Sequence, residues 1–166
     1  MKVYLGTDHA GFNLKEKVKI YLLHEGYDVV DLGAAVYDKD DDYPVFIGRA
    51  AESVSKDPGS RGIVFGGSGQ GEAMVANKFA HVRCALFYAP HVALSEIGIS
   101  GKTSSDPFEM LRLTREHNDS NMLSLSARFL KSTDAIKAVK IFLESPFSPE
   151  ARHKRRINMI EEIVKS

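Results

Sequence analysis

Three short clusters in this sequence combine residue types that can move protons or bind anions. They are residues 7–11 (TDHAG), residues 66–72 (GGSGQGE) and residues 117–119 (HND). Each cluster is expected at or near the junction of a strand and a helix. In folds with parallel strands, ligands bind at the carboxyl ends of the strands, close to a switch point in strand order. We therefore expect all three clusters to meet at that edge of the sheet.

The glycine-rich run at residues 66–71 could bring backbone N–H groups close to a negatively charged ligand. It lacks the Gly-Lys-Ser/Thr ending of a phosphate-binding loop, and Glu72 stands where the last glycine of a dinucleotide-binding fingerprint would be. Nucleotide binding is therefore not favoured. Two interpretations of the run stay open: a tight strand-to-helix turn without a ligand, or a loop that holds an oxyanion.

Glu72 also has two possible roles. A carboxylate in the first turn of a helix is stabilised by the helix dipole by about 0.3–1 kcal/mol, so capping alone would explain it. Beside Ser68 and the glycine N–H groups, the same carboxylate could act as a general base while the loop stabilises an enediolate. The adjacent loop is the feature that favours a catalytic base.

A basic run in the C-terminal helix offers a second anion site. Arg152 and Arg156 are four residues apart, so they share one helix face and could reach one phosphate. The alternative is an ordinary solvated basic face. The neighbouring Ile157, Ile160 and Val164 predict an apolar stripe that packs on the protein, which would bring the arginines close to a cleft.

Composition and charge exclude several classes of protein. The 166 residues include 22 basic and 22 acidic side chains, and 43% are hydrophobic, so disorder is excluded and a nucleic-acid partner is not favoured. The single cysteine, Cys84, cannot form an internal disulfide or a thiolate cage, and the histidines lack metal-ligand spacing. We expect no metal and no cofactor. The N-terminus contains neither a signal peptide nor a membrane span, which indicates the cytoplasm and no membrane partner.

Apolar runs and helical patterns alternate along the chain, which predicts one domain over residues 1–166. We expect an α/β fold, a three-layer α/β/α sandwich around a five-stranded parallel, Rossmann-like sheet. Strands are expected at 3–5, 29–33, 63–65, 84–88 and near 121–126. Helices are expected at 12–25, from 43 to the break at 57–59, 72–79, 90–97, from an Asp106 cap to about 117, 133–144 and 149–165.

A set of motifs then resembles one enzyme family from about residue 1 to 160. The motifs are GTDHAG at 6–11, DYP at 42–44, GSG at 67–69, ANK at 76–78, REHN at 115–118 and RHKRR at 152–156. In this order they are similar to the type B ribose-5-phosphate isomerases, in the group that includes allose- and galactose-6-phosphate isomerases. The resemblance implies a metal-free aldose–ketose interconversion of ribose 5-phosphate and ribulose 5-phosphate through an enediolate.

The resemblance also implies roles for individual residues. Glu72 would be the base, in a branch that has Gly66 where many members have a cysteine. His117 would be the acid that helps to open the sugar ring, with Asn118 beside it, and Tyr43 would line the site. The remaining substrate-binding residues would be Asp8, His9, Gly67, Ser68, Gly69, Gln70, Gly71, Arg128, Arg152 and Arg156. Family members build this site between subunits, so a homodimer or tetramer is implied.

One segment departs from the family pattern. More residues than usual separate the fourth strand from the REHN motif, which predicts an insertion of a helix and a loop near residues 95–108. Because the insertion leads into His117, it could change the substrate that is accepted. An isomerase of a hexose 6-phosphate of the allose or galactose type is therefore the main alternative. A non-catalytic sugar-phosphate sensor is another, although it would have no need of Glu72 or His117.

Overall fold

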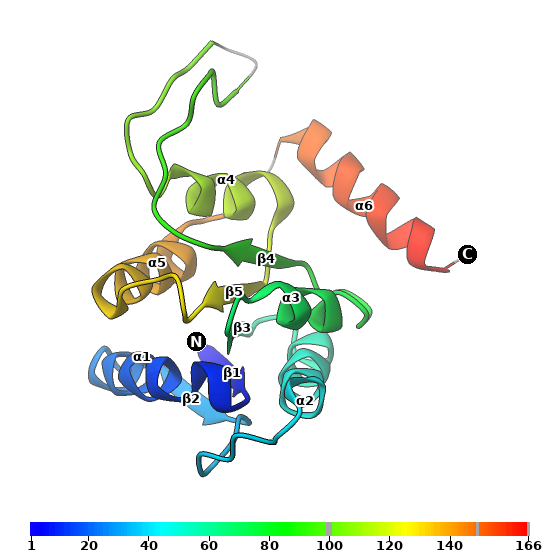
Figure 1. Ribbon diagram of the computed structural model, residues 1–166. Helices are drawn as coiled ribbons and strands as arrows, with labels where there is room; N and C mark the ends of the chain where they lie inside the picture. Colours follow the sequence, from blue (N-terminus) through cyan, green and yellow to red (C-terminus); the bar gives the residue numbers. More distant parts are fainter. Residues whose placement is uncertain (99–100, 149, 166) are drawn as a thin grey trace.

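The computed structural model describes residues 1–98, 101–148 and 150–165. Five parallel strands form a single sheet in the order β2-β1-β3-β5-β4, which confirms the predicted fold class (Figure 1). The strands are β1 (Lys2–Thr7), β2 (Asp28–Asp31), β3 (Arg61–Gly66), β4 (Cys84–Phe87) and β5 (Met122–Ser126). The order changes direction between β1 and β3, so the switch point lies between these two neighbouring strands.

The central strands are apolar on both faces because helices cover both sides of the sheet. Along β3, Ile63 and Phe65 face one core cluster, whereas Val64 faces the other. All three side chains are fully buried. This alternation is the period of two that a strand imposes on its side chains.

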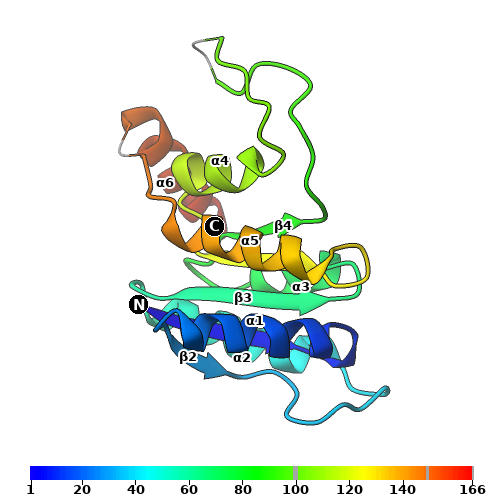
Figure 2. The ribbon, with the colours of Figure 1, turned by 90° about the vertical axis from the view of Figure 1, so that its left-hand side faces the viewer.

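Helices form the two outer layers (Figure 2). The first core cluster joins the sheet to α1, α4 and α5, and the second joins it to α2 and α3. The helices are α1 (Phe12–His24), α2 (Tyr43–Lys56), α3 (Gln70–Ala76), α4 (Glu109–Asn118), α5 (Ser132–Glu144) and α6 (Ala151–Lys165), and a short 3-10 turn covers His9–Gly11. Within the described ranges, none of these helices has the length and apolar character needed to cross a membrane.

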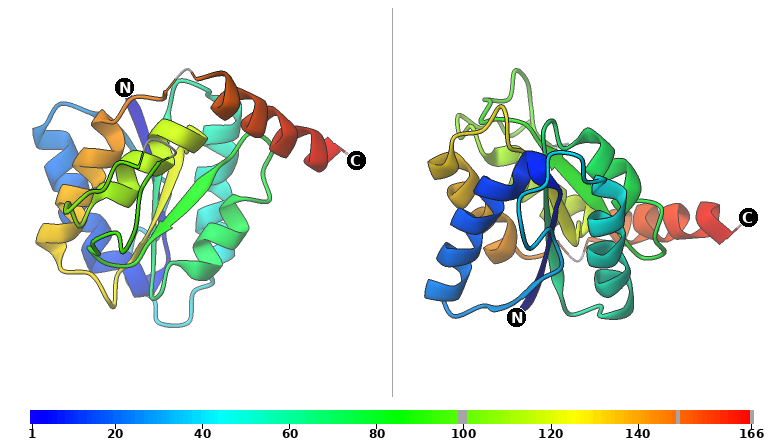
Figure 3. Two further views of the ribbon diagram at one scale, coloured as in Figure 1. Left: turned by 90° about the horizontal axis from the view of Figure 1, so that it is seen from above. Right: turned by 60° about the horizontal axis from the view of Figure 1, so that its bottom comes forward.

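The C-terminal helix α6 packs on α4 and extends away from the body of the molecule (Figure 3). The predicted helix began at residue 149, which lies outside the described residues, and the observed helix begins at Ala151. Several apolar side chains of α6 stay exposed, among them Met159, Ile160 and Ile163. Of the predicted apolar stripe, Ile157 is half-buried and Ile160 is exposed, while the side chain of Val164 lies outside the described residues, so the described part of the stripe anchors α6 only in part.

The helix predicted at residues 90–97 is wrong. The described residues between β4 and α4 form neither a helix nor a strand, and they make a long loop that stands out from the sheet. Leu94 is 94% exposed and Val92 is also exposed, so the apolar residues of the segment have no core to pack against. A short helix has only marginal stability in water without such packing, and the presence of Pro90 at its predicted start does not replace the missing packing.

The start of α4 differs in detail from the expected Asp106 cap. Asp106 Oδ1 accepts a hydrogen bond from the Phe108 N–H at 2.9 Å, and the helix then begins at Glu109. The Glu109 carboxylate accepts a hydrogen bond from the Ser104 hydroxyl at 3.1 Å. Hydrogen bonds to Asp106 and Glu109 therefore order the last residues of the long loop. These residues lead directly into the helix that carries His117.

Candidate active site

The glycine-rich loop places the Glu72 carboxyl group against the end of β3. Gly69 adopts a left-handed backbone conformation with φ of 76° immediately before α3, a conformation that glycine adopts without strain. Glu72 thus falls in the first turn of α3 and is only 5% exposed. A Cβ atom on Gly66 would lie 1.8 Å from Glu72 Oε1. The carboxyl group therefore occupies the space of a side chain at residue 66, so a cysteine there and this placement of Glu72 exclude each other.

The surroundings of Glu72 favour its use as a base. Burial raises the pKa of the Glu72 carboxyl group, and the nearby negative charge of Asp8 raises it further, against the lowering effect of a backbone N–H. A carboxylate whose pKa is shifted toward neutrality is a stronger proton acceptor than an exposed one.

Asp8 and His9 follow β1, next to the glycine-rich loop after β3. Asp8 is buried, and its carboxylate accepts a hydrogen bond from the Ala10 N–H at 2.9 Å, which starts the short turn that carries His9. His9 Nδ1 lies 2.7 Å from Asp41 Oδ1. The hydrogen bond to Asp41 raises the pKa of His9, and the charge of Asp8 adds to this effect against burial and the charge of Arg128.

The end of β5 closes the other side of the glycine-rich loop. The Ala127 and Arg128 N–H groups donate to the carbonyl oxygens of Gly66 and Gly67 at 2.8 and 3.1 Å. A Cβ atom on Gly67 would lie 3.3 Å from Cζ of Arg128, so the guanidinium lies directly over the loop. The positive charge of Arg128 is therefore available to an anion held by this loop.

The remaining residues of the loop have neighbours that shape it. Tyr43 Oη lies 2.7 Å from the position of a Cβ on Gly71, so Tyr43 lies against the loop where the sequence placed it. The Ser68 hydroxyl accepts a hydrogen bond from the Gln70 N–H at 3.3 Å. The Gln70 side chain in turn donates to the Tyr88 hydroxyl. The structure thus brings together Asp8, His9, Tyr43, Gly67, Ser68, Gly69, Gln70, Gly71, Glu72 and Arg128.

His117 and the arginines of α6 form a second group. His117, at the end of α4, packs on the ring of His153 with the ring centroids 4.4 Å apart. A cleft of about 380 Å³ is lined by Glu96, Ile97, Gly98, His117, Arg152, His153 and Arg156. Burial lowers the pKa of His117, and the neighbouring His153 and Arg152 lower it further. This cleft has the positive charge that a phosphate requires.

The two groups lie at opposite ends of the parallel strands, one at the carboxyl ends (the carboxyl edge of the sheet) and one at the amino ends (the amino edge). This corrects the expectation of one site at the carboxyl edge. Glu72 follows the carboxyl end of β3, whereas His117 precedes the amino end of β5, and these strands are parallel. A strand of five residues separates its two ends by about 16 Å. One chain therefore does not bring His117, Asn118, Arg152 and Arg156 to Glu72. In the sequence, the position of residues 117–119 before a strand, and not after one, is the feature that indicates the amino edge.

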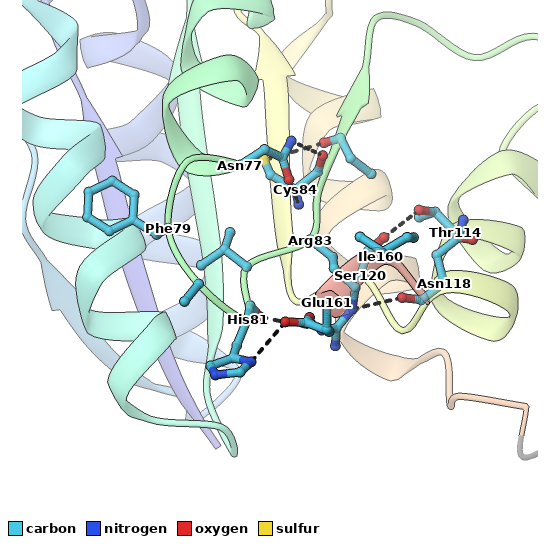
Figure 4. A pocket seen from close by; sticks show the side chains of 13 residues that line it. Asn77, Phe79, His81, Arg83, Cys84, Thr114, Asn118, Ser120, Ile160 and Glu161 are labelled. Carbon is cyan, nitrogen blue, oxygen red and sulfur yellow. Dashed lines mark hydrogen bonds and ion pairs between the residues drawn. The ribbon is translucent and has the colours of Figure 1, made fainter. Parts of the chain in front are cut away.

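Asn118 lines a different cavity from the His117 cleft. This cavity of about 400 Å³ lies between α6 and the connection from α3 to β4 (Figure 4). Its charged groups bind one another, because Glu161 contacts His81 Nδ1 at 3.0 Å and accepts a hydrogen bond from Arg83 at 3.1 Å. Arg83 also pairs with Asp119 at 3.2 Å. The network fastens α6 to the sheet.

One group of side chains has the composition of a metal site. The possible ligand atoms of Asp8, His9 and Asp41 lie within 4.8 Å of one another. However, His9 Nδ1 and Asp41 Oδ1 are 2.7 Å apart, the distance of a hydrogen bond with a proton between the two atoms. The expectation that no metal takes part stays a prediction. Asp41 beside His9 and the buried His153 beside His117 are two residues that were not among the expected site residues.

Known proteins similar to this chain were found by sequence and by structure. A family model described as ribose/galactose isomerase matches residues 3–98 and 98–160. The ribose-5-phosphate isomerase B of Mycobacterium tuberculosis is 40% identical over 162 residues, which cover 98% of this chain and 89% of that protein. The structure of ribose-5-phosphate isomerase B from Mycoplasma genitalium with bound ribulose-5-phosphate has a TM-score of 0.85 and 32% identity, and the match covers 99% and 97% of the two chains. The ribose-5-phosphate isomerase B of Clostridium thermocellum has a TM-score of 0.84 at 34% identity, with 99% and 98% covered.

Proposed function

Because the chain belongs to the ribose/galactose isomerase family, we propose that it interconverts ribose 5-phosphate and ribulose 5-phosphate. The observation that carries this proposal is the buried Glu72 carboxyl group, which lies beside a glycine-rich loop and fills the space above Gly66. A proton on carbon next to a carbonyl is weakly acidic, so its removal needs a base and an oxyanion stabiliser that act together. General-base catalysis typically contributes about 10²–10⁴-fold, and an oxyanion donor about 10²–10³-fold.

In the proposed reaction, Glu72 takes the proton from C2 of the open-chain aldose. The electron pair of that C–H bond passes to O1 as the enediolate forms. Glu72 then delivers the proton to C1 while a proton moves from O2 to O1, which leaves the ketose. Backbone N–H groups of residues 67–71, other than that of Gln70, which donates to Ser68, and the Arg128 charge would stabilise the oxyanion, because they lie at the same loop as the carboxyl group.

We further propose that the complete site forms between two copies of the chain in a homodimer or a tetramer of such dimers. His117, Arg152 and Arg156 of the partner subunit would meet the Glu72 loop of the first subunit. The separation of the two groups within one chain supports this arrangement, since a single sugar phosphate does not span the length of a strand. In a two-fold dimer each subunit contributes its own Glu72 to one site and its own His117 to the other.

Isomerisation of a hexose 6-phosphate is the second candidate. The matched family model covers both ribose and galactose isomerases. Ile97 and Gly98 of the long loop line the cleft that holds Arg152 and Arg156. We propose that residues 95–108 are an insertion that affects substrate choice, which is consistent with the two matched segments that meet at residue 98. The ratio of kcat/KM for ribose 5-phosphate and for allose or galactose 6-phosphate distinguishes the two candidates.

The decisive experiment compares the wild-type protein with Glu72→Gln in the presence of a chelator. We expect wild-type turnover of ribose 5-phosphate without added metal. The Gln variant keeps the size of the side chain and removes the base, so kcat should fall by about 10²–10⁴-fold while binding of the sugar phosphate largely persists. Near-normal turnover by the variant would exclude Glu72 as the base. Binding without any turnover by the wild type, with every sugar phosphate tried, would instead support the sensor.

A further inference from the structure

The acidic segment between β2 and α2 places Asp41 against the ring of His9. The His9 backbone N–H donates to Asp41 Oδ1 at 2.9 Å, and His9 Nδ1 lies 2.7 Å from the same oxygen. The Asp41 side chain is 11% exposed, whereas Asp40 beside it is 79% exposed. Asp38 folds the segment by accepting from the Asp40 and Asp41 N–H groups at 3.1 and 3.3 Å. One carboxylate of the acidic run is therefore turned inward, toward a single histidine.

These two contacts determine which ring nitrogen of His9 carries a proton. A carboxylate oxygen only accepts hydrogen bonds, so Nδ1 must be the donor. Nε2 is then the ring nitrogen left for a ligand, since no residue in the described ranges forms a hydrogen bond with it. The Tyr37 ring packs on the imidazole in a T-shaped arrangement, with the ring centroids 6.2 Å apart, which further fixes the orientation of the imidazole.

The charged groups around His9 favour its cationic form. Asp41 from the β2–α2 segment and Asp8 from the turn after β1 are both acidic, and Asp8 Oδ2 lies 3.7 Å from Nδ1. The positive charge of Arg128, after β5, lowers the pKa of His9. Glu72 of α3 is a further acidic neighbour of Asp8. On balance the pKa of His9 is raised, with the Asp41 hydrogen bond as the largest cause.

We propose that Asp41 is a positioning residue for substrate binding: its carboxylate accepts the Nδ1 proton of the His9 imidazolium, which orients the cationic ring so that its Nε2–H donates to an oxygen of the sugar phosphate. This inference deepens the proposed isomerase function and rests on it. Asp41 makes no contact with substrate itself and acts through His9 alone. A phosphoryl oxygen or a sugar hydroxyl is the acceptor that such a donor fits, since both are anionic or strongly polar oxygens.

The test compares Asp41→Asn with Asp40→Asn, which removes the same charge from the same segment at an exposed side chain. The pKa of His9 is measured by NMR titration of the ring protons, assigned with His9→Gln. We expect Asp41→Asn to lower the pKa of His9 and to raise KM at pH 8 by up to about tenfold, with kcat changed less. The KM difference from wild type should shrink as the pH is lowered, because a larger fraction of His9 is then protonated in both proteins. Asp40→Asn should behave as the wild type.

A second comparison separates positioning through His9 from a general effect on the loop. In a His9→Gln background, Asp41→Asn should raise KM no further, because the ring that it orients is absent. An equal rise in that background, or an unchanged His9 pKa in Asp41→Asn, would overturn the proposal. Asp41→Glu serves if the Asn variant does not fold, and it should restore part of the pKa shift. Loss of wild-type activity on metal removal would also overturn it, because Asp41 would then be a ligand.

The NMR readout also keeps two failures apart. If the wild type isomerises no sugar phosphate, the proposed function fails, yet the His9 titration still reports whether Asp41 controls the pKa of the ring.

The raised His9 pKa further implies that the Asp41 contact stabilises the fold at pH values below the unfolded pKa of 6.5. This contribution to stability is lost as the pH rises through the folded pKa. The Tm difference between wild type and Asp41→Asn should therefore be larger at pH 6 than at pH 9.

Discussion

The two edges of the sheet hold their functional side chains in different ways. At the carboxyl edge, Glu72 is buried against the backbone of Gly66, and the end of β5 is hydrogen-bonded to the same loop. At the amino edge, Arg156 is exposed on a helix that extends from the body of the molecule, next to a long loop without regular structure. Within one chain the first group is rigidly placed, whereas the second is displayed at the surface. This contrast fits the proposed roles, in which the base must be positioned closely and the arginines bind the phosphate at the site of another subunit.

The largest effect is expected from a change that disturbs the carboxyl edge without touching its charge. Gly66→Ala adds a Cβ atom at the place of the Glu72 carboxyl group, which must then move. We expect kcat to fall by about 10²–10⁴-fold, as for loss of the base itself. Gly59→Ala is the matched control, because a Cβ there meets only Asp57 Oδ1 at 4.0 Å. Wild-type kcat in Gly66→Ala would show that the position of the carboxyl group does not matter.

A mixing experiment tests whether the two edges belong to one site. Glu72→Gln and His117→Ala should each be nearly inactive alone. If the edges of two subunits combine, half of the dimers in an equal, re-equilibrated mixture contain both variants, and each of these has one intact site. Activity should then recover to about one quarter of the wild-type value. A mixture as inactive as its components would contradict a site shared between subunits.

The smallest effect is expected where α6 is fastened at the amino edge. Glu161 joins His81 and Arg83 across the cavity beside α6. Glu161→Gln should loosen α6, and partly exposed ion pairs of this kind contribute about 0.2–1 kcal/mol. We expect KM to rise by about two- to fivefold, with kcat nearly unchanged, because only the phosphate clamp is affected. Glu162→Gln, on the exposed side of α6, is the control. A selective loss of kcat would mean that α6 acts on the chemical step.

Much of the carboxyl edge was accessible from sequence because its signals are local. The left-handed Gly69, the first-turn position of Glu72 and the apolar run of β3 all depend on neighbours within a few residues. The family expected from the motifs is confirmed by the matched family model and by relatives over nearly the whole chain. Tyr43, expected to line the site, does lie against the glycine-rich loop.

The errors arose where distant parts of the chain meet. The predicted position of His117 at the carboxyl edge is wrong, because proximity to a strand does not determine at which end of β5 the cluster lies. Nothing in the acidic run at 38–42 itself indicates a contact with residue 9, so the inward turn of Asp41 toward His9 is not predictable from the sequence. The helix expected at 90–97 failed because the pattern of the segment says nothing of whether a core lies beneath it.

The sequence by itself determined the alternation of strands and helices, the glycine positions that allow the Glu72 loop, and the family. These depend on backbone conformation and burial periodicity, which are properties of short segments. Only the tertiary structure decided that Glu72 and His117 face opposite edges, that Asp41 reaches His9, and that the β4–α4 segment stays irregular. Each of these depends on contacts between segments distant in sequence, and their energies arise only when the sheet is assembled.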